Sequence, residues 1–314
     1  MTNTNKFVIA FDTSNYTTSC SVIDLNGDVV KNIKLLLPVD SGERGLRQSE
    51  ALFHHVNRLP GLLDEIRGLG EFVAVGYSKA PRDVDGSYMP CFLAGKCAAT
   101  VASSVLNVPL YSFSHQNGHI MAALYSANKL DLIGETFYAF HVSGGTTEIL
   151  KVTPDSENTF RVELVGGTLD LNAGQVIDRI GVKLGLNFPC GAELERLALE
   201  YDDKPDDFKI SVKGTNCNLS GLENKATALF ESYGDKRRVA LFVLNAVGKT
   251  LKKLSENLLE EHGKHPIVYA GGVMSCSIIK NMLSKYGSFA KPEFSSDNAS
   301  GCALLTLRSY LKEH

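Results

Sequence analysis

The chain has 314 residues, a length that suits either one large α/β domain or two lobes. Its 44% apolar and 21% charged residues are ordinary for a globular protein, and no apolar run reaches the ~20 residues that a membrane span needs. The net charge of -3 lacks the basic excess of a dedicated nucleic-acid-binding protein.

Cysteine usage and the N-terminus indicate the compartment. The seven cysteines are scattered without a Cys-x-x-Cys spacing, so we expect reduced thiols and no zinc ribbon. Residues 1–6 are polar and lead into a short apolar strand, unlike a signal or transit peptide. We therefore expect a cytoplasmic protein with no membrane partner. Two basic clusters, 236–238 and 249–253, are either solvated helix faces or a local surface for RNA.

The first 113 residues alternate short apolar runs with longer helical stretches, which predicts an α/β lobe. An Asn26-Gly27 pair between the second and third runs is a hairpin signal. Helices are expected over 49–68 and 89–106. The predicted strands are 7–11, 17–23, 29–37, 72–77 and 110–113.

Two histidines follow the last of these strands. In a helix, His115 and His119 would share one face, as in helical His-x-x-x-His metal sites. The alternative is that they make hydrogen bonds at a helix start. A metal would need a third ligand, and Asp297 is our candidate because it follows a predicted strand, 292–295, at a helix start. A plain helix N-cap is the alternative for Asp297.

A repeated pattern suggests two related lobes. Residues 10–24 (AFDTSNYTTSCSVID) and 139–153 (AFHVSGGTTEILKVT) share Ala, Phe, Ser, Thr and Thr at the same places. Each reads as a strand, a turn containing serine, and a second strand that begins Thr-Thr. The match is either chance between two similar hairpins or the trace of a duplication.

The second half of the chain predicts glycine-rich turns that could hold phosphate. These turns are 143–146, 166–168 and 271–272. Asp170 and Asp178 could bind ribose hydroxyls or simply face solvent on a helix expected over 170–184. There is no Walker A or Gly-x-Gly-x-x-Gly pattern. The other predicted elements are strands 160–165 and 267–270, a hairpin over 209–219, and helices 193–201, 221–233 and 236–262.

The combined motifs resemble the tRNA threonylcarbamoyltransferase family (TsaD, formerly described as O-sialoglycoprotein endopeptidases). In chain order they are His-x-x-x-His, Ser-Gly-Gly-x-Thr, Gly-x-x-x-Asp-x-x-Ala-Gly, Pro-x-Gly, Ser-Gly-Leu, Ala-Gly-Gly-Val and Ser-Asp-Asn-Ala. The resemblance implies an α/β, actin-like ATPase and sugar-kinase fold with two duplicated lobes around a nucleotide cleft. We expect an N-terminal lobe over 1–128 and a C-terminal lobe over 129–314, whose last helix could pack back on the first lobe.

The resemblance also implies site residues. One divalent metal, iron or zinc, would bind His115, His119 and Asp297. An ATP- or AMP-type nucleotide, or threonylcarbamoyl-adenylate, would contact the second set. That set is Ser143, Gly144, Gly145, Thr146, Asp170, Gly174, Asp178, Gly191, Gly271 and Gly272.

Several polar positions depart from the family's pattern. Tyr16 and Thr17 stand where the family's first turn has two acids, Asn117 replaces a Glu between the histidines, and Thr146 replaces a His. Gln175 stands where a Glu is expected. We regard Tyr16 and Asn117 as divergent candidates for catalytic positions. Without a His-Glu-x-x-His motif, peptidase activity is not expected.

The resemblance implies transfer of threonylcarbamoyl from its adenylate to adenosine 37 of tRNA. The implied partners are tRNA, met through a basic patch or partner proteins, and a hetero-complex with other threonylcarbamoylation proteins. The departures leave two alternatives open: an enzyme on the same scaffold with another acceptor, or a non-catalytic nucleotide-binding subunit beside a complete family member.

Overall fold

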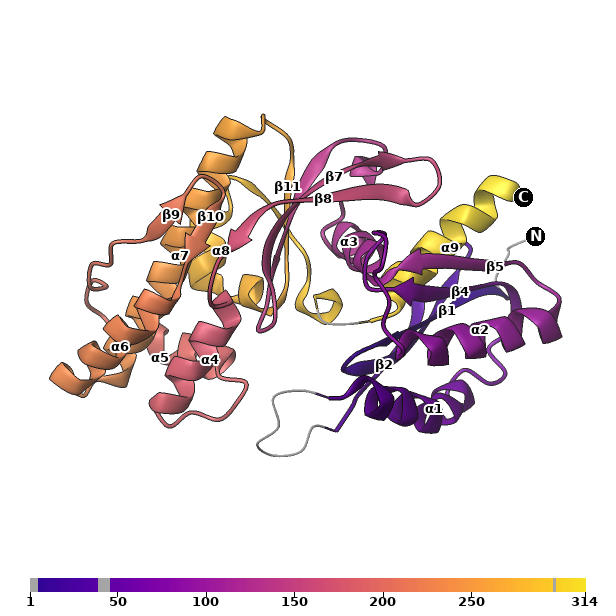
Figure 1. Ribbon diagram of the computed structural model, residues 1–314, viewed down its shortest axis with the longest axis horizontal. Helices are drawn as coiled ribbons and strands as arrows, with labels where there is room; N and C mark the ends of the chain where they lie inside the picture. The colour runs from indigo at the N-terminus through magenta and orange to yellow at the C-terminus, as the bar shows by residue number, and fades with distance from the viewer. Residues whose placement is uncertain (1–4, 39–45, 296–297) are drawn as a thin grey trace. The chain divides into compact units, whose positions relative to one another are not determined.

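The computed structural model describes residues 5–38, 46–295 and 298–314. Its contacts divide the chain into two compact units (Figure 1). The first falls within Met1–Leu130, Asp155–Arg161 and Ser296–His314, and the second within Asp131–Pro154 and Val162–Ser295. No helix among the described residues is long and apolar enough to cross a membrane.

The first unit is built on a five-stranded sheet in the order β3-β2-β1-β4-β5. β1 runs antiparallel to β2 and parallel to β4, and β5 is parallel to β4. Gly27 turns the chain between β2 and β3 at φ 92°, as the Asn-Gly signal predicts. The strands are β1 (Lys6–Ser14), β2 (Thr17–Asp24), β3 (Val29–Leu36), β4 (Glu71–Ala80) and β5 (Leu110–Ser114).

Helices cover both faces of this sheet. α1 (Gln48–Asp64) and α2 (Phe92–Leu106) pack on the face that carries Phe7, Ile9 and Phe11. α9 (Ser300–Glu313) packs on β1, β2 and β4 and crosses α3 (His115–Ser126). A short 3-10 turn, η1, spans Leu130–Leu132.

Close contacts at two glycines position α9. A β-carbon on Gly301 of α9 would lie 1.8 Å from the carbonyl oxygen of Gly118, in the first turns of α3. A β-carbon on Gly76 of β4 would lie 1.9 Å from Oγ1 of Thr306, also on α9. Gly301 therefore lets α9 approach α3, the helix that carries the histidine pair, and Gly76 lets α9 approach β4.

The second unit contains a seven-stranded sheet in the order β12-β11-β6-β7-β8-β10-β9. β6 is antiparallel to β7 and parallel to β11, and β11 is parallel to β12. The strands are β6 (Phe137–Val142), β7 (Thr147–Asp155), β8 (Thr159–Thr168), β9 (Ser211–Lys213), β10 (Asn216–Asn218), β11 (Ile267–Ala270) and β12 (Gly287–Phe289).

Five strands of the second sheet repeat the topology of the first. The run β8-β7-β6-β11-β12 follows the same chain order as β3-β2-β1-β4-β5, with the parallel pairs at the same places. The repeated fifteen-residue pattern marks the first hairpin of each sheet, β1–β2 and β6–β7. The two sheets therefore share one design, to which the second adds β9 and β10.

Five helices share one apolar core with the second sheet. Buried residues of β6, β7 and β11 belong to the same cluster as buried residues of all five helices, and α5 and α6 pack on α4 and α7. The helices are α4 (Ala173–Lys183), α5 (Gly191–Leu199), α6 (Ser220–Tyr233), α7 (Lys236–Glu261) and α8 (Ser277–Leu283), with 3-10 turns η2 (Gly272–Ser275) and η3 (Pro292–Phe294).

Two local predictions were wrong. Gly166 and Gly167 lie inside β8 rather than in a turn. Glycine is needed there because β-carbons at these two positions would lie 2.2 and 2.4 Å from the carbonyl oxygens of Thr215 and Thr147. The predicted strand at 292–295 is instead η3, which begins at a proline, and the strand of this region is β12. The glycines lie in a strand where other backbone segments approach closely, and β12 forms because it pairs with β11.

Candidate functional sites

The histidine pair lies in the first turn of α3, in the first unit. Ser114 caps this helix, because its Oγ accepts the backbone N–H of Asn117 at 3.2 Å. The helix therefore begins at His115, and His119 follows one turn later on the same face. The two Nε2 atoms are 2.8 Å apart, so both ring edges meet at one point.

A buried carboxylate lies behind this pair. Nδ1 of His115 is 2.7 Å from Oδ2 of Asp12, near the end of β1, and Asp12 is 1% exposed. The hydroxyl of Ser78, on β4, donates a hydrogen bond to the same Oδ2. The backbone N–H of Ser14 donates to Oδ1 at 3.0 Å. β1, β4 and α3 are thus joined at one carboxylate.

The two divergent candidates, Tyr16 and Asn117, lie in different environments. Tyr16 is 43% exposed in the β1–β2 turn, and its carbonyl accepts the N–H of Leu37. Asn117 is buried, and its side-chain amide donates to the carbonyls of Asn158 and Phe160 at 2.9 and 3.2 Å. The amide of Asn117 therefore ties α3 to the segment 155–161.

In the second unit, the predicted nucleotide residues gather around the turn between β6 and β7. The N–H of Ser143 closes this turn on the carbonyl of Thr146 at 2.7 Å. The N–H of Gly174, in the first turn of α4, donates to the carbonyl of Ser143 at 3.1 Å, and a β-carbon on Gly174 would lie 2.6 Å from the amide nitrogen of Gly144. The start of α4 thus packs directly on the turn.

Gly271 brings a third segment to the same turn. Its φ is 104°, and a β-carbon there would lie 2.2 Å from the carbonyl oxygen of Val142, at the end of β6. Gly272, which begins η2, has no atom within 4 Å of such a β-carbon. Only the first of these two glycines is therefore fixed by packing.

Asp178 connects the turn to α5. Its Oδ1 accepts the N–H of Cys190 at 2.8 Å, and Gly191 then begins α5. Its Oδ2 would be 3.9 Å from a β-carbon on Gly144. Burial raises the pKa of Asp178, and the hydrogen bond from Cys190 only partly opposes this effect.

A cavity of about 490 Å³ opens beside Gly144 and Asp178. Two of its apolar lining residues are strongly exposed, Phe188 at 75% and Val182 at 54%. Glu223 is 7% exposed at its edge and pairs with both Arg179 and Lys183, with N–O distances of 3.0 Å. The complete lining is Gly144, Gln175, Asp178, Arg179, Val182, Lys183, Phe188 and Glu223.

Asp170 has a different role from Asp178. It precedes α4, and its carboxylate accepts the N–H groups of Leu171, Leu219 and Ser220, the last two at the start of α6. Burial pushes its pKa up, but these hydrogen bonds outweigh burial and hold the pKa well below its usual range. The carboxylate therefore joins the segment just before α4 to the start of α6, and it does not line the cavity beside Gly144.

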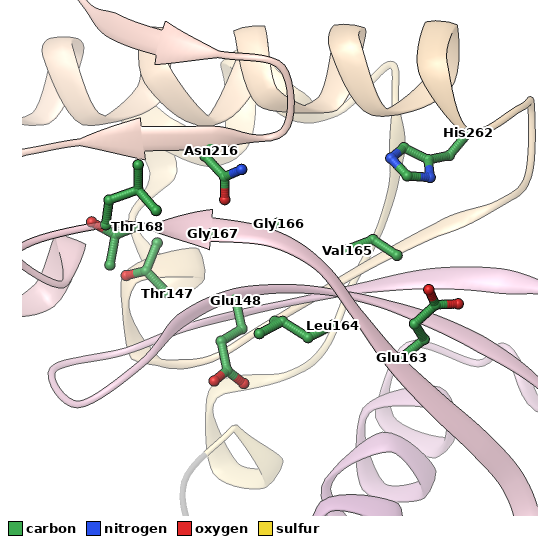
Figure 2. A pocket seen from close by; sticks show the side chains of 11 residues that line it. Thr147, Glu148, Glu163, Leu164, Val165, Gly166, Gly167, Thr168, Asn216 and His262 are labelled. Carbon is green, nitrogen blue, oxygen red and sulfur yellow. The ribbon is translucent and has the colours of Figure 1, made fainter.

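A second cavity of about 500 Å³ lies along β8 (Figure 2). Glu148, Glu163 and His262 stand around it, together with the glycines that were expected to hold phosphate. Because Gly166 and Gly167 are used for close packing within the sheet, we assign this cavity no nucleotide.

Comparison with known proteins decides the family. Residues 51–303 match the sequence profile described as TsaD, tRNA N6-adenosine threonylcarbamoyltransferase. The chain belongs to this family. Two tRNA N6-adenosine threonylcarbamoyltransferases are each 27% identical to it. The one from Methanopyrus kandleri is matched over 88% of this chain and 80% of its own, and the one from Christiangramia forsetii over 98% and 94%.

Solved structures confirm the predicted fold. HypF of T. kodakarensis superposes with a TM-score of 0.59 at 13% identity, over 98% of this chain and 48% of its own. The activator of 2-hydroxyisocaproyl-CoA dehydratase from Clostridium difficile gives a TM-score of 0.52 at 14% identity, over 98% of both chains. The chain therefore has the actin-like ATPase and sugar-kinase fold.

The TsaD family implies a divalent metal, and the donors at the histidine pair suit one. Two imidazole nitrogens at about 2.1 Å from one ion lie about 3.0–3.4 Å apart, so the pair would separate by only a few tenths of an ångström. Within residues 5–38, 46–295 and 298–314, no group of three or more His, Cys, Asp or Glu side chains is placed to hold a metal. The third predicted ligand, Asp297, lies outside the described residues.

Sequence reasoning on this TsaD-family chain missed Asp12 and Ser78. Asp12 directly follows the apolar run 7–11, which was the available signal, and it lies near the end of β1. Its partners are 66 and 103 residues away along the chain, so the contact could not be read from local patterns.

Proposed function

We propose that this chain transfers a threonylcarbamoyl group from threonylcarbamoyl-adenylate to the N6 amine of adenosine 37 in tRNA. The observation that carries the proposal is a converging histidine pair, backed by a buried carboxylate, in a chain that matches the TsaD family over 51–303. In the reaction the amine forms a bond to the carbamoyl carbon and gives up one proton to solvent, the bond from that carbon to the phosphate oxygen breaks, and AMP leaves.

His115 and His119, with Asp297, would hold the divalent ion. When bound, such an ion polarises a carbonyl and stabilises negative charge. The two histidines supply neutral nitrogen donors, the type that both iron and zinc accept.

The residues around the β6–β7 turn would bind the adenylate. We assign the phosphate to the backbone N–H groups of Gly144 and Gly145, beside the N-terminus of α4. Asp178 would accept a ribose hydroxyl through Oδ2, since Oδ1 already accepts the N–H of Cys190. Phe188 and Val182 offer apolar surface for the adenine ring in the neighbouring cavity.

The experiment is complementation. A bacterial strain depleted of its own threonylcarbamoyltransferase receives this gene, and its tRNA nucleosides are measured by mass spectrometry. We expect threonylcarbamoyladenosine to return with the wild type and to be lost with His115→Ala or His119→Ala. His54→Ala, a histidine of α1 outside the pair, is the matched control and should behave as wild type. Unmodified tRNA with well-expressed wild-type protein would contradict the proposal.

One observation favours an alternative acceptor. Tyr16 presents an exposed phenol in the first turn, where the family pattern carries acids. If the wild type consumes threonylcarbamoyl-adenylate in vitro but leaves tRNA unmodified, the acceptor differs. If it binds AMP and consumes no adenylate, the chain is the nucleotide-binding subunit.

A further inference from the structure

Asp12 is a buried carboxylate for which the proposed reaction has no direct use. Its three contacts come from β1, β4 and α3. Because β1, β4 and β5 are mutually parallel, their carboxyl ends lie at one edge of the sheet, and α3 begins where β5 ends. Asp12, Ser78 and His115 meet at that edge.

The contact fixes which nitrogen of His115 carries a proton. A carboxylate oxygen accepts hydrogen bonds, so Nδ1 of His115 donates to Oδ2 of Asp12. Nε2 of His115 then presents its lone pair, and it presents it toward Nε2 of His119, 2.8 Å away. In a neutral ring this is the tautomer that a metal ion at Nε2 requires.

Ser78 and Ser14 hold the carboxylate in turn. Ser78 donates to the same Oδ2 that His115 contacts, and the N–H of Ser14 occupies Oδ1. With Asp12 1% exposed, rotation of its carboxylate would break hydrogen bonds that water cannot replace. The orientation of the His115 ring is therefore fixed by its hydrogen bond to the Asp12 carboxylate.

We propose that Asp12 is a positioning residue for a metal at His115 and His119, acting through the Nδ1–H of His115, with Ser78 holding it in place. The inference rests on the metal site of the proposed function. The competing explanation is that Asp12 only joins α3 to the sheet, in which case its loss would lower the melting temperature and leave metal affinity alone.

The test measures metal binding rather than turnover. Zn²⁺ affinity is titrated against a chromophoric chelator, and Co²⁺ is added separately because its visible spectrum reports its donors. We expect Asp12→Asn to weaken Zn²⁺ binding about 10- to 100-fold and to alter the Co²⁺ spectrum, the usual result of losing such a partner. The amide is nearly isosteric, but its NH2 group can donate to Nδ1 and so favour the wrong tautomer.

Matched variants separate positioning from folding. In Asp24→Asn the altered carboxylate also accepts backbone N–H groups of the first unit, those of Asn26 and Asp28, far from the histidines. It should bind Zn²⁺ like the wild type. If Asp12→Asn does not fold, Ser78→Ala is measured instead, and a several-fold loss of Zn²⁺ affinity is expected.

The outcomes distinguish this inference from the proposed function. Wild-type Zn²⁺ binding that His115→Ala abolishes and that Asp12→Asn and Ser78→Ala leave intact would overturn the positioning role alone. Absence of Zn²⁺ and Co²⁺ binding by the wild type would overturn it together with the metal site. Weakened binding in Asp12→Asn with normal binding in Asp24→Asn supports it.

Discussion

Single side chains in this protein owe their properties to burial and to a few hydrogen bonds. His55, on α1, is fully buried and lies 2.8 Å from the hydroxyl of Thr18 through Nδ1. Burial lowers the pKa of His55 from 6.5 to about 4, although the nearby carboxylate of Asp12 and a backbone contact with Ser14 oppose this. The folded protein therefore excludes a proton that the unfolded chain binds below pH 6.5.

The first prediction concerns pH. Because the unfolded chain takes up this proton, the free energy of unfolding should fall as pH drops from about 6.5 toward 4. His55→Asn can still pair with Thr18 but does not titrate. We expect its melting temperature to fall several degrees less than that of the wild type between about pH 7 and pH 4.5. Equal losses in the two proteins, measured by circular dichroism, would refute the assignment.

The second prediction contrasts two aspartates. Asp178→Asn keeps an acceptor for the N–H of Cys190, so we expect a folded protein whose AMP affinity falls about tenfold, as measured by calorimetry. Asp170→Asn removes charge from a carboxylate that accepts the N–H group of Leu171 and two N–H groups at the start of α6. It should lower stability by about 1 kcal/mol and leave AMP affinity unchanged. If Asp170→Asn instead weakened AMP binding and Asp178→Asn only lowered stability, the two assignments would be wrong.

At the scale of elements, glycines set how closely segments approach. Gly271 combines a positive φ with a β-carbon position 2.2 Å from a backbone carbonyl, whereas its neighbour Gly272 has open space. Both were predicted as nucleotide contacts from the same Gly-Gly pair. Their different packing provides a test in which each variant is the control for the other.

The third prediction uses this pair. Gly271→Ala should lower the free energy of unfolding by more than about 2 kcal/mol, because the chain must move apart from β6 and adopt a strained φ. Gly272→Ala should change it by less than about 0.5 kcal/mol. Urea denaturation measures both. Equal effects would show that the turn tolerates a side chain at either place.

Local patterns predicted most elements but not their long-range contacts. The buried strands, the Asn-Gly hairpin and the repeat were readable, because period and turn chemistry are local signals. The position of Gly166 and Gly167 within a strand could not be predicted, since it depends on contacts with Thr147 and Thr215 in distant segments. Short β12 was missed for the same reason: three residues carry little propensity, and pairing with β11 creates the strand.

Predicting the candidate sites met the same limit. Residue types and spacing pointed to the histidines and to the glycine-rich turn at 143–146, whose neighbours now include Gly174 and Asp178. Asp170 and Asp178 looked equivalent in the sequence, and only the positions of α5 and α6 separate them. Asp297, outside the described residues, stays a prediction.

At the scale of the whole molecule, each unit carries its own candidate ligand site. Ligands that bind only the folded state stabilise the region they contact. The fourth prediction is therefore that Zn²⁺ slows hydrogen exchange at the end of β1 and the start of α3, while AMP slows it around 143–146 and 173–191. His119→Ala should abolish the Zn²⁺ effect and keep the AMP effect. Protection by Zn²⁺ elsewhere in the chain would place the metal at another site.

The crossing of α3 by α9 also has a consequence for synthesis on the ribosome. One face of the first sheet is covered by α9, which begins at Ser300, about 140 residues after Arg161, the last earlier residue of its unit. That helix touches the turn of α3 that carries the histidines. At roughly 5–20 residues per second, synthesis of α9 begins about 7–28 s after this earlier part of the unit is complete, and until then that face of the sheet is uncovered. A chaperone that shields apolar sheet surface during that interval should raise the yield of the full chain. Ribosome stalling just before Ser300 should leave β1, β4 and α3 sensitive to protease.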